Sequence, residues 1–162
     1  MEFSLEDYEW MTLAIALAKT AACQGEVPVG AVVVYKGELI GQGFNQTVAH
    51  NDPTAHAEII AIRAAAERLN NYRLPGCRLY VTLEPCLMCI GAIFHARIEH
   101  VIFGAWDPKT GACGSVLDAC ALTRLNHHAS CRGGLMAETC GALLSDFFSA
   151  KRAAGRLNRE QS

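Results

Sequence analysis

The sequence has 162 residues, of which 51% are hydrophobic and 19% are charged, with a formal net charge of −2 at pH 7. This length is typical of one domain with one buried core, and the composition excludes a mainly disordered chain. No apolar run approaches the roughly 20 residues of a membrane-spanning helix, and the acidic N-terminal residues do not resemble a secretory signal, so we expect a cytoplasmic protein that binds no membrane.

Hydrophobic periodicity predicts helices alternating with strands along the chain. The expected elements are a helix over 4–25, a β-hairpin over 29–44, a helix from the Asp52-Pro53 cap to about 70, a strand over 78–83, a helix over 86–96, a short strand over 101–105, a weak strand within 129–135 and a long helix from 136. This order predicts an α/β fold, a three-layer α/β/α sandwich with a mixed central sheet of about five strands and helices on both faces.

The charges are unevenly distributed along the chain. Residues 151–162 carry four basic side chains against one acidic side chain, although the whole chain is slightly acidic. A solvated helix end, where cations complement the helix dipole, and a contact with a polyanion both fit this pattern. We expect one domain over 1–152 and a basic C-terminal tail over 153–162.

Eight cysteines are many for a chain of this length, but only Cys86 and Cys89 have the spacing of metal ligands. Because no secretory signal is expected and the core needs no covalent staples, the sequence predicts reduced thiols rather than disulfides. We interpret the remaining six as structural or incidental: Cys23, Cys77, Cys113, Cys120, Cys131 and Cys140.

Two predicted helices begin beside reactive side chains, His56 and Glu58 on the first and Cys86 and Cys89 on the second. Cysteines three residues apart share one helix face, and the positive end of the helix favours their thiolates. With His56 as the third ligand, a tetrahedral ion keeps one position open for water, as in catalytic zinc sites. Glu58 is then the acid and base. His56 and Glu58 can address one centre only if His56 lies in the irregular first turn, because residues two apart diverge on an ideal helix.

Other classes of protein share parts of this pattern. A lone Cys-x-x-Cys after a strand is also typical of thiol oxidoreductases, which carry no stoichiometric zinc. A zinc-bearing RNA-binding module without turnover has no need of Glu58. The combination of His-x-Glu with a later Pro-Cys-x-x-Cys is more specific than either part and is the signature of zinc-dependent nucleobase deaminases.

The chain resembles the bacterial tRNA-specific adenosine deaminases, within the cytidine/deoxycytidylate deaminase superfamily, from about residue 8 to 152. The matching stretches are EVPVGA (26–31), DPTAHAE (52–58), YVTLEPCLMC (80–89), FGAWDPKTG (103–111), NH (126–127) and LLSDFF (143–148). The earlier stretches are shared with free-base deaminases, so a guanine or cytosine deaminase is the alternative. The later stretches favour the tRNA enzymes.

This resemblance implies a cytidine-deaminase-like fold and a hydrolase that converts adenosine to inosine at the wobble position, the first of the anticodon. It implies one zinc ion per chain, held by His56, Cys86 and Cys89, which activates water while Glu58 transfers protons to the ring and the leaving ammonia. The implied partners are the tRNA anticodon arm and a second copy of the chain in a homodimer, without DNA. The implied substrate contacts are Asn45, the Ala57 N–H, Asp107, Phe148 and Arg152.

Several of these residues also have simpler interpretations. Asn45 commonly ends a strand, Asp107 precedes a proline in a turn, and Phe148 packs in the core if its helix faces inward. An apolar face with Ile90, Ile93 and Phe94 fits either a dimer interface or core packing. The loop 46–51 borders the expected substrate opening and shows no family-specific pattern, so it does not predict an anticodon preference.

Overall fold

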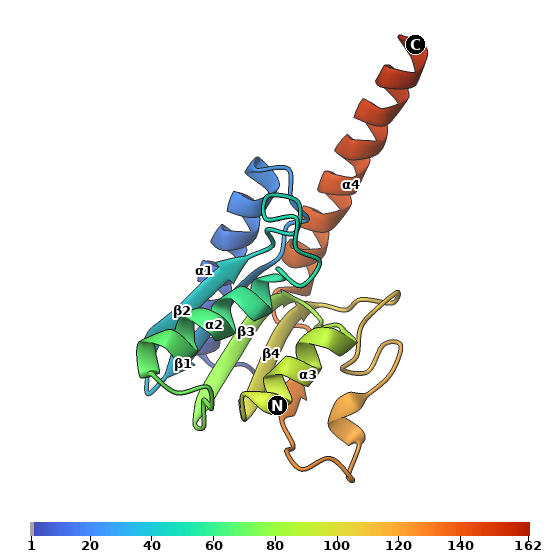
Figure 1. Cartoon of the computed structure of the whole chain (residues 1–162). Coiled ribbons are helices and arrows are strands. Elements are labelled where there is room, and N and C mark those ends of the chain that lie inside the picture. Colours follow the sequence, from blue (N-terminus) through green and yellow to red (C-terminus); the bar gives the residue numbers. More distant parts are fainter. Residues whose placement is uncertain (1) are drawn as a thin grey trace.

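The computed structural model of the chain describes residues 2–162, which form one five-stranded sheet between layers of helices (Figure 1). The helices are α1 (Leu5–Cys23), α2 (Ala57–Leu69), α3 (Leu87–His95) and α4 (Ala137–Glu160), with a 3₁₀ turn η1 (Ala119–Ala121), and the strands are β1 (Gly30–Tyr35), β2 (Glu38–Phe44), β3 (Cys77–Leu83), β4 (His100–Ala105) and β5 (Ser130–Arg132). The predicted order of elements is confirmed, including the weak last strand. No helix in residues 2–162 has both the length and the apolar character needed to cross a membrane.

The strand order is β2-β1-β3-β4-β5. β1 runs antiparallel to β2 and β3, while β3, β4 and β5 are mutually parallel. Side chains such as Tyr80 and Ile102 pack on one face against α1 and α4. Val33 and Leu79 point to the opposite face, where they pack with the buried residues of α2 and α3. The three-layer α/β/α sandwich with a mixed sheet is therefore confirmed.

The beginning of α2 differs from the prediction. The Asp52 carboxylate accepts hydrogen bonds from the Thr54 N–H at 2.9 Å and the Thr54 hydroxyl at 2.7 Å, and so caps a tight turn rather than a helix. The helix begins only at Ala57, with His56 as an extended N-cap residue at φ −74° and ψ 153°. His56 thus lies outside the helix, which removes the angular conflict with Glu58.

The cysteine prediction was wrong for one pair, because Cys120 of η1 and Cys131 of β5 form a disulfide. Folding brings η1 over the edge of the sheet, so that the two Cα atoms lie 6.7 Å apart, within disulfide range. The sequence separation of 11 residues gave no sign of this proximity. Ile90 and Ile93 are fully buried in the core, which supports the core interpretation of these two side chains.

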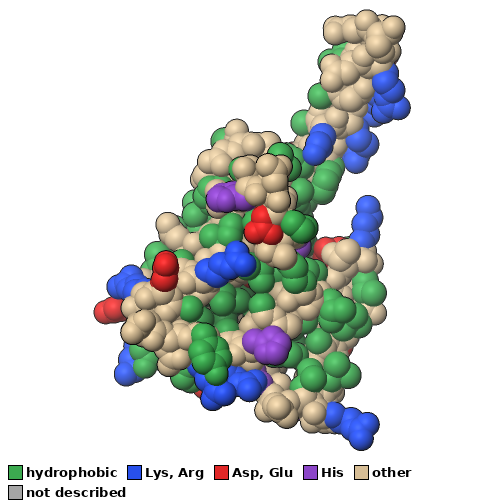
Figure 2. Space-filling model, in the orientation of Figure 1, with side chains coloured by type: hydrophobic (Ala, Val, Ile, Leu, Met, Phe, Trp, Pro, Cys, Tyr) green, Lys and Arg blue, Asp and Glu red, His purple; other side chains and the backbone are tan. Residues whose placement is uncertain are grey.

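The long helix α4 continues without a break through residues 151–160 and projects beyond the sheet (Figure 1). Basic side chains lie exposed along this projecting part (Figure 2). They are Lys151, Arg152, Arg156 and Arg159. The expected C-terminal tail is thus helical over most of its length.

Candidate active site

Two helix N-termini meet at the carboxyl end of β3 and bring the three expected metal ligands together. His56 is the N-cap of α2, Cys86 is the N-cap of α3, and Cys89 lies in the first turn of α3. The His56 Nδ1 atom lies 3.7 Å from the Cys86 Sγ and 3.5 Å from the Cys89 Sγ. Ligands at ordinary zinc bond lengths and tetrahedral angles lie about 3.6 Å apart, so the donor set and its spacing fit a zinc ion.

The electrostatics of this triangle favour a thiolate next to a proton donor. Hydrogen bonds from Cys89 and His56 lower the pKa of Cys86 to about 4. The bond to Cys86, together with burial, raises the pKa of Cys89. The pKa of His56 is raised by its hydrogen bond with Cys86. These three side chains are suited to a divalent cation, because the cation takes the place of the protons in the hydrogen bonds among His56, Cys86 and Cys89.

Glu58 is the second residue of α2 and is almost fully buried next to His56, Cys86 and Cys89. Burial raises the pKa of Glu58, which favours its protonated form more than in an exposed carboxyl group. Glu58, His56 and Cys86 line a cavity of about 240 Å³. The structure therefore places a buried carboxyl group and two of the three metal-ligand candidates at one small cavity.

Two of the expected substrate contacts bind each other. The Asn45 side chain follows β2 and lines the cavity, and its Oδ1 atom accepts a hydrogen bond from the Ala57 N–H at 2.8 Å. The Ala57 N–H, which we expected to face the base, thus donates to Asn45 in this structure.

Asp107 lines the same cavity and is also a turn residue. One carboxylate oxygen accepts from the Lys109 and Thr110 N–H groups, at 3.0 and 3.2 Å, and the other accepts from the Thr110 hydroxyl at 2.7 Å. The simpler interpretation of Asp107 as a turn residue is therefore confirmed, and the same side chain lines the cavity.

A larger groove of about 590 Å³ adjoins the cavity, and Val27, Leu83, Asp107 and Thr110 line both. Phe148 and Arg152 of α4 line its outer wall. Phe148 is 40% exposed, so it does not pack in the core. The expected site residues therefore follow one continuous depression from the metal-ligand candidates to α4.

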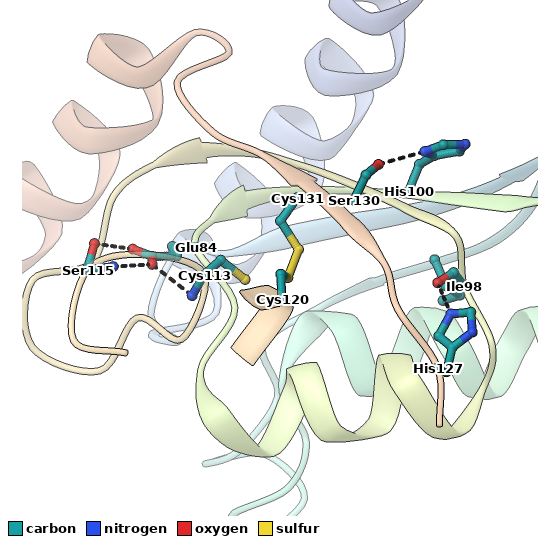
Figure 3. Close-up of a disulfide and its surroundings, with 9 residues drawn as sticks. All are labelled: Glu84, Ile98, His100, Cys113, Ser115, Cys120, His127, Ser130 and Cys131. Atoms are coloured by element: carbon teal, nitrogen blue, oxygen red, sulfur yellow. Dashed lines mark hydrogen bonds between the residues drawn. A yellow bond between two sulfur atoms is a disulfide. The ribbon is translucent and has the colours of Figure 1, made fainter. Parts of the chain in front are cut away.

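Sequence reasoning missed two buried carboxylates that hold the loops around this depression. Glu84 accepts hydrogen bonds from the N–H groups of Cys113 and Ser115 at 3.0 Å each, and from the Ser115 hydroxyl (Figure 3). It also accepts a hydrogen bond from the Asp107 N–H at 2.8 Å. Glu26 accepts from two N–H groups of the loop 46–51, at 3.0 and 2.9 Å. The sequence held one sign of these two residues: Glu26 and Glu84 are charged side chains in mostly apolar stretches that match the family.

Comparison with known proteins agrees with this geometry. Residues 5–105 match the family described as the cytidine and deoxycytidylate deaminase zinc-binding region. The tRNA-specific adenosine deaminase of Haemophilus influenzae is 46% identical over 154 residues, which cover 94% of this chain and 89% of that protein. The chain belongs to the tRNA-specific adenosine deaminase family. The Bacillus subtilis tRNA-specific adenosine deaminase is 44% identical and is covered over 97% of its length.

Solved structures of relatives show the same fold. A structure from a study of A-to-I editing by tRNA:A34 deaminases has a TM-score of 0.81 and 44% identity, covering 84% of this chain and 99% of that one. The guanine deaminase of Bacillus subtilis gives a TM-score of 0.60 and 42% identity over 64% of this chain and 66% of that one. The tRNA deaminase structure thus matches with a higher TM-score and over a larger share of this chain than the guanine deaminase of Bacillus subtilis does.

Proposed function

We propose that the protein hydrolyses adenosine to inosine, with release of ammonia, at the wobble position of a tRNA. The observation that carries this proposal is the continuous depression from the His56, Cys86 and Cys89 triangle to the basic helix α4. A free base needs only the inner cavity, whereas an anticodon loop also needs a polar and basic surface around it. The near full-length similarity to tRNA-specific adenosine deaminases supports the same conclusion.

The donor set supports zinc as the cofactor, one ion per chain. When bound by His56, Cys86 and Cys89, zinc acts as a Lewis acid and lowers the pKa of a water molecule to about 7. Both thiols must lose their protons to bind it, and the low pKa of Cys86 supports the first of these losses.

Glu58 carries the protons in this proposal. Its carboxylate takes a proton from the attacking water and delivers it to a ring nitrogen of adenine, while the water oxygen bonds to carbon 6. Glu58 then takes the proton of the new hydroxyl group on carbon 6 and delivers it to the amino group, so that the carbon–nitrogen bond breaks, ammonia leaves and the carbon 6 carbonyl of inosine forms. Glu58 is almost fully buried, which limits its contact with bulk water and raises its pKa.

The outer residues recognise the RNA. We infer that Asn45, whose Oδ1 atom is held by the Ala57 N–H, contacts the edge of the base through its amide group, and that Asp107 accepts from the ribose 2′-OH, a group that DNA lacks. Phe148 offers an exposed ring for stacking on a neighbouring nucleotide, and Arg152 contacts its phosphate. The chemistry belongs to the domain over 1–152, and residues 153–162 add positive charge.

We also propose a cytoplasmic homodimer. The surface beside α3 has a groove of about 380 Å³ edged by exposed leucines, of which Leu87 is 61% and Leu122 is 52% exposed. A second copy of the chain would cover them. Light scattering that gives a single-chain mass at micromolar concentration would exclude this dimer.

The function is tested by inosine formation in an anticodon stem-loop whose first anticodon position is adenosine. Matched substrates are the same stem-loop with adenosine at the second anticodon position, and free adenine, guanine and cytosine. We expect inosine only at the first anticodon position. Deamination of a free base without any change in the RNA would retain the hydrolytic chemistry and overturn the assignment of tRNA as substrate.

A further inference from the structure

Three cysteines outside the candidate active site converge from three segments of the chain. Cys113 lies in the loop after β4, Cys120 in η1 and Cys131 in β5, yet their Sγ atoms all lie within 4.8 Å of one another. Cys120 and Cys131 are joined by the disulfide, and Cys113 is a free and buried thiol. Figure 3 shows the Cys113 side chain pointing towards that disulfide.

We propose that Cys113, Cys120 and Cys131 form a second thiol centre, which binds a soft metal ion such as Zn²⁺ or Cu⁺ when reduced and closes as the Cys120–Cys131 disulfide when oxidised. Thiolates select such ions over Mg²⁺ or Ca²⁺. Sulfur ligands of one tetrahedral zinc ion lie about 3.8 Å apart, so the three sulfur atoms are already close to a binding arrangement.

The charges around the cluster favour a cation. The Glu84 carboxylate accepts a hydrogen bond from the Cys113 N–H at 3.0 Å, and Asp118 is paired with Cys113 through a backbone bridge. Three thiolates beside two acidic residues repel one another, and a metal ion among the sulfur atoms offsets this repulsion. This inference rests on the cluster alone and does not depend on the proposed function.

The change between the two states balances as ordinary thiol chemistry. A dithiol reductant gives two electrons and two protons to the Cys120–Cys131 bond, which breaks into two thiols while the reductant closes its own disulfide. A phosphine achieves the same reduction and ends as the phosphine oxide, with its oxygen taken from water. The metal ion then binds as the thiol protons pass to solvent.

The cluster shares a loop with the candidate active site. The Ala112 N–H bonds to the Pro85 carbonyl at 2.9 Å, and Gly111 pairs with Cys86. Cys113 and Asp107 are both held by Glu84. An ion bound at the cluster therefore stabilises the loop that borders the proposed substrate opening.

The test is the zinc content of the full chain, measured by mass spectrometry of the native protein after removal of loosely bound metal. Protein reduced with a phosphine, which does not compete as a thiol ligand, is expected to hold two zinc ions per chain, and the oxidised protein one. Reduced Cys113→Ala and Cys120→Ala are expected to hold one. His56→Ala loses the other ion and keeps the one at the cluster, so the two sites are counted separately.

Two variants serve as matched controls, Cys23→Ser for an exposed thiol and Cys140→Ala for a buried one, and both keep two zinc ions. A cadmium titration gives a second readout, because each sulfur–cadmium bond adds charge-transfer absorbance. Because oxidised and reduced wild-type protein are compared directly, the test survives poor folding of a variant. One zinc ion in the reduced wild type, or two in Cys113→Ala, would overturn the proposal.

Discussion

Asn45 and Ala57 form a hydrogen bond of 2.8 Å that ties the end of β2 to the first residue of α2. Ala57 lies between His56 and Glu58, so this single bond fixes the segment that carries a proposed metal ligand and the proposed proton carrier. The bond also satisfies one of the free N–H groups at the beginning of the helix, which ordinarily needs a capping side chain. His56, the N-cap residue, makes no side-chain capping bond of its own and points to the cysteines instead.

Two substitutions of Asn45 distinguish its role in holding the beginning of α2 from its proposed contact with the substrate base. Asn45→Ala leaves the Ala57 N–H unpaired, so we expect a loss of about 1–2 kcal/mol in the free energy of unfolding and a large fall in kcat/KM. Asn45→Asp keeps an acceptor for Ala57 and should restore stability but not activity, since the amide donor is gone. Urea unfolding beside single-turnover kinetics measures both effects. Full activity in Asn45→Asp would show that Asn45 only positions the helix.

Glu58→Gln tests the proton carrier. We expect the variant to bind one zinc ion at the His56 site and to lose roughly 10²–10⁴-fold in kcat, because Gln has the size of Glu but cannot transfer the protons. Removal of the ion with a chelator should abolish turnover in the wild type, and added Zn²⁺ should restore it. The measurements are metal content and inosine formation on the same preparation. A variant with zinc and near-normal turnover would be incompatible with the role given to Glu58.

Glu84→Gln tests the buried carboxylate that holds the loop with Asp107. A glutamine side chain has one acceptor oxygen where the Glu84 carboxylate has two. At least one of the loop N–H groups therefore loses its acceptor, at a cost of about 1–3 kcal/mol in the free energy of unfolding. We expect KM for the RNA to rise more than kcat falls, because the loop borders the opening rather than the reacting atoms. The exposed Glu67→Gln is the control. Equal effects of the two variants would refute the positioning role.

Gly43→Ala tests the close approach of β2 to α2. A Cβ atom at Gly43 would lie 2.8 Å from the Ala57 carbonyl oxygen and 2.8 Å from the Ile60 Cβ, so the first turn of α2 must move. We expect a loss of about 1–3 kcal/mol and reduced activity, because that turn carries Glu58. Gly91→Ala is the matched control, since it meets no atom within 4 Å and lies inside helix α3, where Ala is favoured. Thermal unfolding and turnover that match between the two variants would contradict this prediction.

Asp7 should contribute to the acid sensitivity of the fold. Burial by itself raises the pKa of Asp7, but hydrogen bonds from Ser4 and Tyr80 and the charge of Arg78 outweigh it, and the pKa is lowered overall. A lowered pKa in the folded state adds stability above the unfolded pKa of about 3.9, and this contribution is lost as the pH falls through the folded value.

The corresponding experiment compares urea unfolding at pH 7 and near pH 3. Asp7→Asn should be less stable than the wild type by about 1–2 kcal/mol at pH 7, and the difference should shrink at the lower pH. The exposed Asp146→Asn is the control. A difference that grows on acidification would show that the sign is wrong.

The sequence by itself predicted the order of elements, the sandwich and the metal-ligand candidates. These depend on local patterns, since helical periodicity, β-branched runs and residues three apart on one helix turn hardly vary with the rest of the fold. Cys86 and Cys89 stand at a helix start, where a spacing of three residues predicts that they face together, whereas the grouping of His56 and Glu58 with them followed from the combined His-x-Glu and Pro-Cys-x-x-Cys signature.

Only the tertiary structure decided where α2 begins and which cysteines lie close enough to bond or to share a metal ion. An Asp-Pro pair can cap a helix or a turn. Here Asp52 caps a turn with Thr54, and Asn45, which lies twelve residues before Ala57, holds the Ala57 N–H at a later helix start. Cys113, Cys120 and Cys131 meet because η1 and β5 fold over the same sheet edge, and no local pattern encodes the path of the loops between them. Contacts between distant segments depend on how loops close, which is a property of the packed chain and not of its neighbouring residues.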